Sequence, residues 1–196
     1  MDTQVRLPDR SIHIRKAAVR LFKTRGFMAT TMRDMAEEVG IEAASLYNHI
    51  QSKQGLLHEI CFGMSHRYLN NLERNLHARR TSNLRSVLES HLDIILQYTD
   101  EAAVAESEWR HLAEPARNDF RIKRQNYEDR LLGLIELAIK QKRIRQMEPK
   151  VVLYTVLAAV QWIQRWYSER RNIDKGILKQ NILSMIFEGL ETKGNG

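Results

Sequence analysis

The chain has 196 residues, 43% of them hydrophobic and 28% charged, with only 9 Gly and 3 Pro, which excludes a disordered or collagen-like chain. Lysine and arginine number 31 against 24 acidic residues, and the net charge of +7 makes a polyanionic partner worth testing without identifying it. The single cysteine, Cys61, excludes an intramolecular disulfide framework and a metal site made of cysteine alone.

The apolar residues recur at helical spacing along nearly the whole chain. No segment shows the strict alternation of a half-buried β-strand, so we predict an all-α fold. The first stripe, in residues 14–22, predicts an amphipathic helix of about four turns that stops near Gly26.

Two short helices are expected next. Thr31 and Asp34 form the N-terminal capping pattern of a helix that Gly40 ends. Only two residues then separate it from a third helix, predicted over residues 43–49 and too short to be stable alone. Two short helices joined by a turn of this length predict a helix-turn-helix unit.

Six further helices follow, which brings the total to about nine. They are predicted over residues 52–76, 84–98, 100–112, 115–138, 149–167 and 174–190. Asp100 and Asp174 are expected to cap two of them, and Pro149 suits the first turn of another.

The sequence contains no segment suited to cross a membrane. The longest apolar stretch, residues 151–160 apart from Thr155, is shorter than the roughly 20 residues that a spanning helix needs. The first ten residues also lack the apolar region of a signal peptide. We therefore expect a cytoplasmic protein with no membrane partner.

Residues 14–60 carry a recognisable pattern of short motifs in a fixed order. These motifs are Gly26-Phe27, Thr30-Thr31, Arg33-Asp34-Met35-Ala36, Val39-Gly40-Ile41, Ser45-Leu46-Tyr47 and Ser52-Lys53. The pattern resembles the N-terminal DNA-binding domain of the tetracycline-repressor (TetR) family. The resemblance implies a DNA-binding domain over residues 1–52 and a ligand-binding and dimerisation domain over residues 53–196. It also implies a non-enzymatic homodimer that binds a double-stranded palindromic operator and is released by a small-molecule inducer.

The resemblance also implies which residues meet DNA. They are Thr31, Arg33, Ala43, Ala44, Ser45, Tyr47, Asn48, His49 and Lys53. Alanine methyl groups can contact only thymine methyls, so Arg33 is the candidate for a guanine or phosphate contact that adds discrimination. Structural roles remain open for three of them: Tyr47 in the core, Lys53 as one solvated charge, and Thr31 as a cap only.

The chain departs from the family pattern in two places. Glu42 and Ala43 stand where the family usually places a capping Ser or similar residue, often followed by Lys or Gln. This departure weakens hydrogen-bonded base readout and leaves the operator sequence open. Gly55 stands where many members have an acidic capping-box residue, so the next helix is expected to fray or bend at its start.

Scattered residues in the second half resemble a branch of the family that often responds to acyl-CoA thioesters. The candidate ligand-binding residues are His91, Trp109, Arg110, Arg117, Arg121, Arg124, Tyr127, Trp162 and Trp166. Arg117, Arg121 and Arg124 share one helical face, a spacing suited to CoA phosphates, while the aromatic residues suit an acyl channel. A solvated face balanced by Glu114, Asp119 and Glu128 is the alternative for the arginines. Core or dimer packing is the alternative for the tryptophans and His91.

The last two helices, within residues 151–167 and 174–190, are where the family dimerises. Their wide apolar faces fit that role, because the earlier of the two is apolar nearly all round.

Two other function classes were weighed. Glu108 and His111 form one Glu-x-x-His motif, but a di-metal carboxylate enzyme needs a second such motif, which the other histidines do not supply. We therefore expect no metal site and no cofactor. An architectural DNA-binding protein without an inducer also remains possible, and a ligand-sized cavity in the second half would argue against it.

Overall fold

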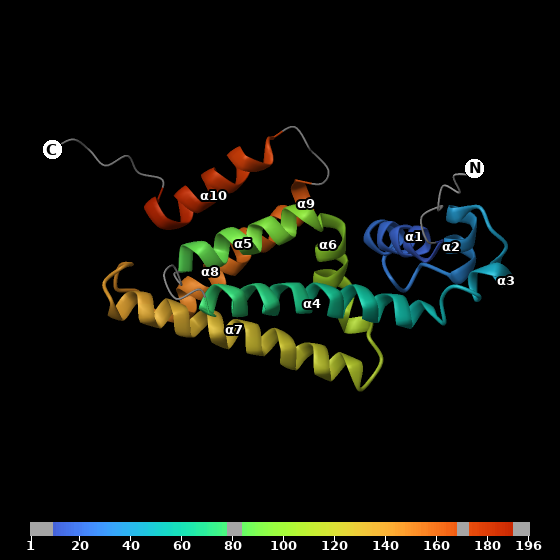
Figure 1. Cartoon of the computed structure of the whole chain (residues 1–196), viewed down its shortest axis with the longest axis horizontal. Coiled ribbons are helices and arrows are strands. Elements are labelled where there is room, and N and C mark those ends of the chain that lie inside the picture. Colours follow the sequence, from blue (N-terminus) through green and yellow to red (C-terminus); the bar gives the residue numbers. More distant parts are fainter. Residues whose placement is uncertain (1–9, 78–83, 168–172, 190–196) are drawn as a thin grey trace, which may run out of the picture. The chain divides into compact units, whose positions relative to one another are not determined.

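The structure is a computed structural model and describes residues 10–77, 84–167 and 173–189. These residues form ten α-helices and one 3₁₀ helix, with no β-strand among them (Figure 1). The elements are α1 (Arg10–Arg25), α2 (Met32–Val39), α3 (Ala43–Leu46), α4 (Lys53–His77), α5 (Leu84–Gln97), α6 (Thr99–Glu108), η1 (Trp109–His111), α7 (Ala116–Lys140), α8 (Pro149–Gln161), α9 (Ile163–Trp166) and α10 (Lys175–Glu188). The all-α prediction is confirmed. The expected nine helices are recovered when α8 and α9 are counted as one interrupted helix.

The chain folds into two compact units. The first comprises the described residues within Met1–Met64 and Asp100–Arg121, and the second those within Ser65–Thr99 and Ile122–Gly196. This structural division differs from the boundary at residues 52 and 53, which was expected on functional grounds and stays a prediction. The difference arises because α6, η1 and the start of α7 pack with the three N-terminal helices.

The first unit is built around side chains that α1, α2 and α3 turn inward. Phe22, Met35 and Leu46 are fully buried, one from each helix. The ring of Phe27 meets Phe22 edge-on at a centroid distance of 5.2 Å. Burying a side chain of this size contributes about 1.5–3 kcal/mol, which is how a helix as short as α3 is held in place.

The third helix is shorter than predicted. It ends at Leu46, and the expected residues 47–49 form a turn instead. The amide groups of Asn48 and His49 donate to the carbonyls of Ser45 and Leu46, three residues back, at 3.3 and 3.0 Å. This tighter spacing is typical of a helix end that winds into a 3₁₀ turn.

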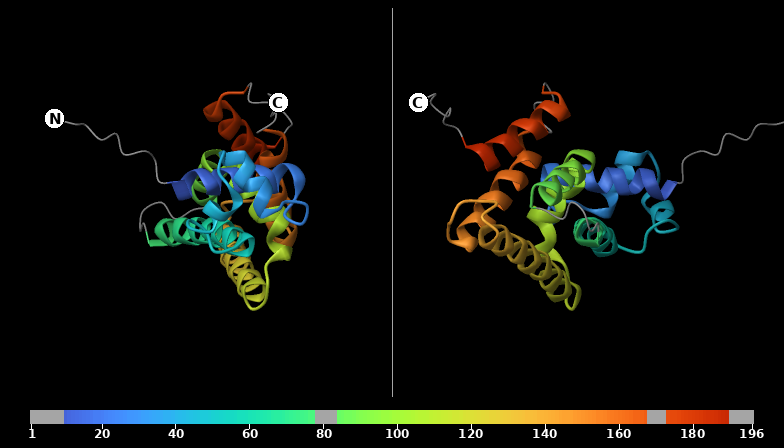
Figure 2. Two further views of the ribbon diagram at one scale, coloured as in Figure 1. Left: turned by 90° about the vertical axis from the view of Figure 1, so that its right-hand side faces the viewer. Right: turned by 60° about the vertical axis from the view of Figure 1, so that its left-hand side comes forward.

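The second unit is organised around α5, whose apolar side chains reach three neighbours. Leu88, Leu92 and Ile95 are fully buried in a core that also receives side chains from α7, α8 and α10. α5 contacts α8, α9 and α10, and the ribbon views show it flanked by α8 and α10 (Figures 1 and 2). The second half of α4 lies beside α7, where Arg130 pairs with Glu73.

The termini predicted for three helices, α6, α8 and α10, agree only in part with the structure. Asp174 caps α10 as expected, accepting from the amides of Gly176 and Ile177 at 2.8 and 3.0 Å, and Pro149 opens α8. The α10 helix ends at Glu188, whereas the predicted end at Leu190 lies outside the described residues. Asp100 does not cap the helix predicted for it, because α6 begins one residue earlier at Thr99 and Asp100 lies inside the first turn.

The helix predicted over residues 149–167 is interrupted. A turn at Trp162 separates α8 from the four-residue α9. None of the helices in the described parts of the chain combines the length and apolar character that a membrane span requires.

Candidate functional site

The α2 helix begins with a reciprocal cap. The Thr31 hydroxyl accepts from the Asp34 amide at 3.1 Å, and the Asp34 carboxylate accepts from the Thr31 amide at 2.7 Å. Hydrogen bonds from the Thr31 side chain and backbone, followed by the charge of Arg25, lower the pKa of Asp34 below its ordinary value. The carboxylate therefore stays ionised and the cap stays closed around neutrality.

The turn between α2 and α3 depends on Gly40. Its φ of 69° lies in the left-handed region, and its amide donates to carbonyls of the preceding helix turn. The following helix, α3, starts at Glu42 without any side-chain cap. The missing cap agrees with the departure noted in the sequence at Glu42.

The α3 segment presents a polar and small surface to solvent. Ala43, Ala44, Tyr47 and Asn48 are exposed, and Tyr47 has 59% of its surface accessible. Leu46 points the opposite way and is fully buried. A core role, which the sequence left open for Tyr47, therefore does not apply to it, because its neighbour Leu46 packs the core and Tyr47 faces solvent.

The other predicted DNA-contacting residues border this surface. Thr31, Arg33 and His49 are exposed, and Ser45 is half-buried. The Arg33 side chain is 83% accessible, and its Nε donates to the Glu37 carboxylate at 3.1 Å. An exposed pair of this kind contributes little to stability, so the guanidinium can exchange Glu37 for another anion at small cost.

Lys53 does more than carry a charge. Its ammonium group donates to the carbonyls of Phe27 and Thr30 at 2.9 and 2.7 Å and lies 4.3 Å from the centre of the Phe27 ring. The first residue of α4 therefore closes the loop between α1 and α2. The Ser52 hydroxyl accepts from the Gly55 amide at 3.0 Å and so caps the first turn of α4, while Gly55 has no side chain to return the second bond of a capping box.

A second set of contacts joins the α1–α2 loop to α6 and η1, within the first unit. The Glu108 carboxylate accepts from the Phe27 amide at 2.9 Å, and the His111 ring stacks on Phe27 at 5.9 Å. Gln54 donates to the His111 carbonyl and accepts from the Ala113 amide, at 2.8 and 3.2 Å. The sequence analysis considered Glu108 and His111 only as part of a metal motif, which it rejected, and it did not predict their contacts to the loop.

Charged pairs extend the same connection along α1. Lys23 donates to Asp100 at 2.9 Å, and Arg15 pairs with Glu101 at 3.5 Å. Asp100 therefore serves α6 as an ion-pair partner for α1, where the sequence had predicted a cap.

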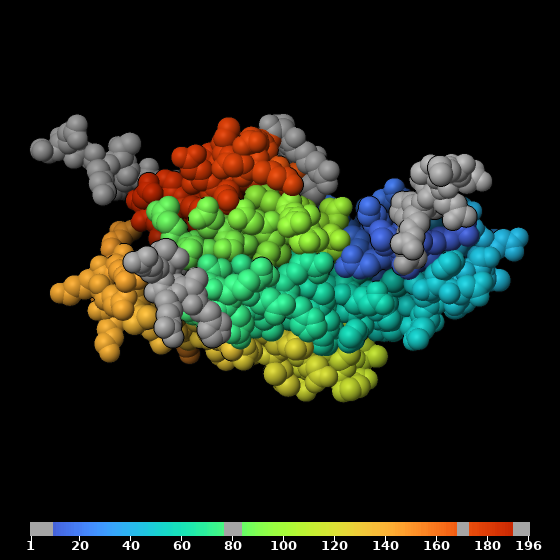
Figure 3. All heavy atoms as spheres, in the orientation of Figure 1, coloured from blue at the N-terminus to red at the C-terminus, as the bar shows by residue number. Residues whose placement is uncertain are grey.

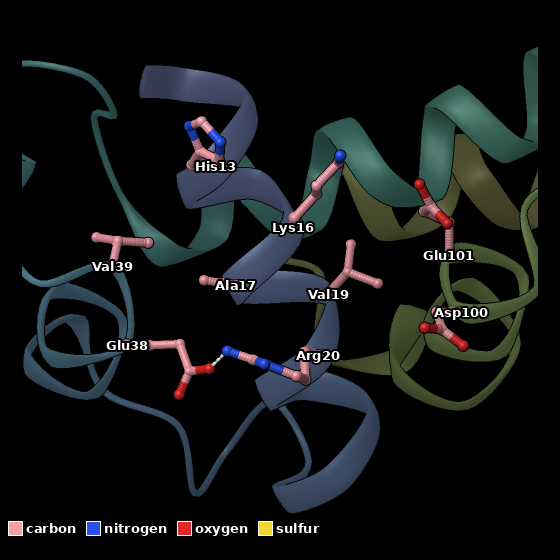
Figure 4. Close-up of a pocket in the computed structure, with 9 residues that line it drawn as sticks. All are labelled: His13, Lys16, Ala17, Val19, Arg20, Glu38, Val39, Asp100 and Glu101. Carbon is pink, nitrogen blue, oxygen red and sulfur yellow. Dashed lines mark ion pairs between the residues drawn. The ribbon is translucent and has the colours of Figure 1, made fainter. Parts of the chain in front are cut away.

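A groove of about 640 Å³ also lies in the first unit, among α1, the end of α2 and the start of α6 (Figure 4). Basic side chains face it from α1 and carboxylates from α2 and α6. Arg20 pairs with Glu38 across it. Because charges of both signs line the groove and several are paired, it offers no surface selective for an anion.

The predicted ligand-binding residues divide between the two units. Trp109, Arg110, Arg117 and Arg121 belong to the first unit, where they line a small open pocket of about 350 Å³. Arg117 pairs with Glu114 at 2.7 Å, and hydrogen bonding from Arg117 lowers the pKa of that carboxyl group. Arg117 therefore has the carboxylate partner that the alternative of a balanced, solvated face required.

The remaining candidates lie in the second unit. His91 is only 2% accessible, and its Nδ1 lies 2.6 Å from the Tyr127 hydroxyl, while its ring stacks on Tyr68 at 4.4 Å. Burial lowers the pKa of His91 to about 4 and raises that of Tyr127, so both are neutral around neutrality. The Nε2 atom of His91 is buried with no hydrogen-bond partner among the described residues.

The last three candidates have different surroundings. Trp162 is 58% accessible beneath the Arg165 guanidinium, Trp166 packs against the core of the second unit, and Arg124 is half-buried on α7. A metal centre has no support in the parts of the chain that the structure describes, where no three acidic, histidine or cysteine side chains gather.

Family models match both halves of the sequence. Residues 14–60 match the model of bacterial regulatory proteins of the tetR family. Residues 77–190, more than half of the chain, match the model of the tetracyclin repressor-like C-terminal domain.

Individual relatives cover nearly the whole chain. The HTH-type transcriptional repressor KstR2 of Rhodococcus jostii is 28% identical over 185 residues, covering 91% of this chain and 89% of that protein. KstR2 of Mycobacterium tuberculosis is 23% identical over 184 residues, covering 90% of each. Both are described as regulators of transcription and neither as an enzyme.

Solved structures share the fold. The ketosteroid transcriptional regulator KstR2 of Mycobacterium tuberculosis aligns with a TM-score of 0.84 at 19% identity, covering 96% of this chain and 98% of that one. AibR in complex with isovaleryl coenzyme A and operator DNA aligns with a TM-score of 0.75 at 24% identity, covering 91% and 98%. At such identities the similarity shows the fold alone.

Proposed function

Because this chain belongs to the tetracycline-repressor (TetR) family of DNA-binding transcriptional regulators, we propose that it represses transcription as a homodimer on a palindromic operator and leaves DNA when a small apolar ligand binds. The observation that carries the proposal is the exposed surface of α3, backed by the buried Leu46. A short helix that turns small and polar side chains outward can enter the major groove without distorting its own core.

The base contacts are assigned to the residues that α3 exposes. The methyl groups of Ala43 and Ala44 suit thymine methyls, and Ser45 and Asn48 add hydrogen-bonding groups. Arg33 supplies the strongest candidate for a guanine or phosphate contact, after releasing Glu37. Thr31, Tyr47, His49 and Lys53 are assigned to the phosphate backbone, which fixes position without reading sequence.

A second copy of the chain is assigned to the outer faces of α8 and α10. Val151 and Tyr154 are exposed on α8, Trp162 is exposed directly after its last residue, and Ile177 and Met185 are exposed on α10, each at least half accessible. Large apolar side chains that remain exposed along two neighbouring helices mark a surface that another protein covers. A two-fold dimer would also place two recognition helices about 34–36 Å apart.

The inducer is assigned to the acyl-CoA class. AibR, which shares the fold, was solved with isovaleryl coenzyme A, and the first unit of this chain has a small pocket where arginines lie beside Trp109. Guanidinium groups suit the phosphates of such a ligand. In the second unit, considered by itself, the orphan Nε2 of His91 suits a carbonyl oxygen. Ligand binding by the nine residues predicted from the sequence is proposed only as part of this assignment of the inducer to the acyl-CoA class.

The contacts of Phe27 supply a route from ligand to DNA. The loop that precedes α2 is bound by Glu108 and His111 of the α6–η1 segment, and Trp109 of the same segment lines the arginine pocket. A ligand that favours one position of this segment would shift the loop, and a coupling of about 1–3 kcal/mol is sufficient for release.

The test begins with selection of a preferred DNA sequence from a random duplex library by the full-length protein. We expect a palindrome whose half-sites are about one helical turn apart. The Tyr47→Ala and Arg33→Ala variants should weaken binding to the selected site, whereas Arg74→Ala, which removes an exposed cation of α4, should not. Selection of no sequence would contradict sequence-specific repression.

Titration of the operator complex then tests the inducer. Acyl-CoAs of several chain lengths should release the DNA, while CoA and free fatty acids should act more weakly. Release by a free acid or a cationic drug, with no response to any acyl-CoA, would contradict the assignment of the inducer to the acyl-CoA class. The proposal that the protein is a repressor would still hold. Absence of release by any ligand would favour the architectural alternative.

A further inference from the structure

We propose that the second unit carries a separate binding site for a small anionic amphiphile, a molecule with a carboxylate or phosphate head and an alkyl body. The site is a cavity of about 880 Å³ formed by the end of α7, the α7–α8 connection, and the facing ends of α5, α8 and α10. The surfaces of these segments come together at one end of the unit (Figure 3). Its volume lies within the range of natural small-molecule pockets.

The floor of the cavity is apolar. Leu134, Leu137, Ile144, Val152 and Phe187 line it from four different segments. Leu137, on α7, is 47% accessible and so offers apolar surface to a ligand. Apolar surface of this kind gains free energy when an alkyl chain displaces water from it.

The rim of the cavity is cationic. Lys142, Arg143 and Arg145 line it from the α7–α8 connection, and Arg85 lines it from the first turn of α5. Arg85 pairs with Glu188 at 3.1 Å, whereas the other three have no anionic partner among the residues that the structure describes. No carboxylate of the described residues lines the cavity itself. The electrostatic complement of such a rim is an anion.

The backbone of the connection is well defined at this point. The Lys142 amide donates to the Ile139 carbonyl and the Arg143 amide to the Ala138 carbonyl, both at 2.9 Å, which is the hydrogen-bond pattern of a Schellman helix end. Lys142 takes the left-handed position with a φ of 55°, where glycine is the usual residue. These two bonds fix the backbone from which the cationic side chains reach the rim.

The arrangement favours an amphiphile over a nucleic acid. A phosphate backbone would use the cations and leave the apolar floor in water, whereas an alkyl anion uses both. The cavity shares none of its residues with the nine candidates assigned to the inducer. The proposal therefore stands whether or not the inducer is an acyl-CoA.

Calorimetric titration of the full-length protein with decanoate, decyl phosphate and decanol tests the proposal. Both anions should bind with one ligand per chain, and neutral decanol should bind about tenfold more weakly. The methyl resonance of Met147, a lining residue, should shift with the same affinity.

Charge reversal locates the site. The Arg143→Glu/Arg145→Glu variant should bind decanoate about tenfold more weakly, since two attractive charges become repulsive. The Lys140→Glu/Lys150→Glu variant is the matched control, because it makes the same change in net charge at residues that do not line the cavity. It should bind as the wild type does. Unfolding midpoints should agree among all three, because these side chains are exposed.

Three outcomes would overturn the proposal. Equal affinity of the wild type and the Arg143→Glu/Arg145→Glu variant for decanoate would exclude the cationic rim as the binding site of the anionic head. Equal losses of decanoate affinity in the two charge-reversal variants would indicate that the net charge of the protein, and not this site, governs binding. Binding only to anionic phospholipid vesicles, with no response to monomeric decanoate or decyl phosphate, would make the patch a membrane contact instead.

Discussion

The ammonium group of Lys53 lies where a structural role and a DNA-binding role overlap. Its hydrogen bonds to the Phe27 and Thr30 carbonyls satisfy two acceptors in the loop that leads to α2. A variant that loses affinity for DNA at this position would therefore report on loop closure as well as on phosphate contact.

Replacement of Lys53 by Ala should lower the free energy of unfolding by about 2 kcal/mol, because two charge-assisted hydrogen bonds are lost. Chemical denaturation of the variant against wild type measures this. Lys16→Ala, which removes an exposed cation of α1, is the control and should change stability little. An unchanged denaturation midpoint for Lys53→Ala would mean that water replaces Lys53 at the Phe27 and Thr30 carbonyls without any loss of stability.

His91 makes the stability of the protein depend on pH. Its pKa is about 4 in the fold and near 6.5 in the unfolded chain, so between these values only the unfolded chain binds the proton. Stability should be constant above about pH 6.5 and fall as the pH drops toward 4, by about 2 kcal/mol between pH 7 and pH 5. His91→Gln keeps a group for the Tyr127 hydroxyl and does not titrate. The difference in the free energy of unfolding between the wild type and His91→Gln should therefore shrink as the pH falls from 7 to 5, because only the wild type carries this titrating group.

The residues that sequence reasoning placed correctly are those whose partners are close in the chain. Thr31 and Asp34 could be paired from a spacing of three, and the structure confirms the cap. The contacts of Lys53 with Phe27 and of Glu108 with the same loop join residues 26 and 81 positions apart. The helical spacing of apolar residues carries no information about contacts so far apart in the sequence, so these roles could be recognised only from the structure.

The turn between α2 and α3 is the element on which the orientation of the recognition segment depends. Gly40→Ala should destabilise the protein by about 1 kcal/mol, because a Cβ in the left-handed region is strained even where nothing lies within 4 Å of it. Gly40→Asn should cost less, since Asn tolerates that region. Thermal unfolding of both variants checks the order, and equal midpoints for the three proteins would contradict a conformational cause.

Helix type was predictable at this scale and helix ends were not. The apolar stripes identified every described α-helix, but the break at Trp162 divides a continuous apolar pattern into α8 and α9. α3 shows the converse, because its helical pattern continues beyond Leu46 while the backbone tightens into a turn. Both ends depend on packing against other helices, which a stripe does not encode.

The dimer surface is a property of the whole molecule, and the structure changes the choice of residues that test it. Ile182 and Ile186 belong to the apolar pattern of α10, but both are half-buried against the core of their own unit. Charges there would disturb folding and association together. Tyr154 and Ile177 are 58% and 54% accessible and avoid this difficulty.

The Tyr154→Asp/Ile177→Asp variant should sediment as a monomer at micromolar concentration, where the wild type is expected to be a dimer that buries well over about 1,000 Å². Ile122→Asp is the control, because Ile122 is a similarly exposed apolar residue on α7, at 52%. A dimeric double variant would place the interface elsewhere.

The path of the chain between its two compact units bears on how such regulators can be recombined. The first unit takes its last 22 residues, Asp100–Arg121, from the middle of the sequence, and they supply Asp100, Glu101 and Glu108 to the N-terminal helices. A graft of the N-terminal helices onto a foreign effector domain would leave these partners behind. A functional chimera of this chain must therefore carry two separate segments from one parent, which makes the chain less modular than its linear domain map suggests.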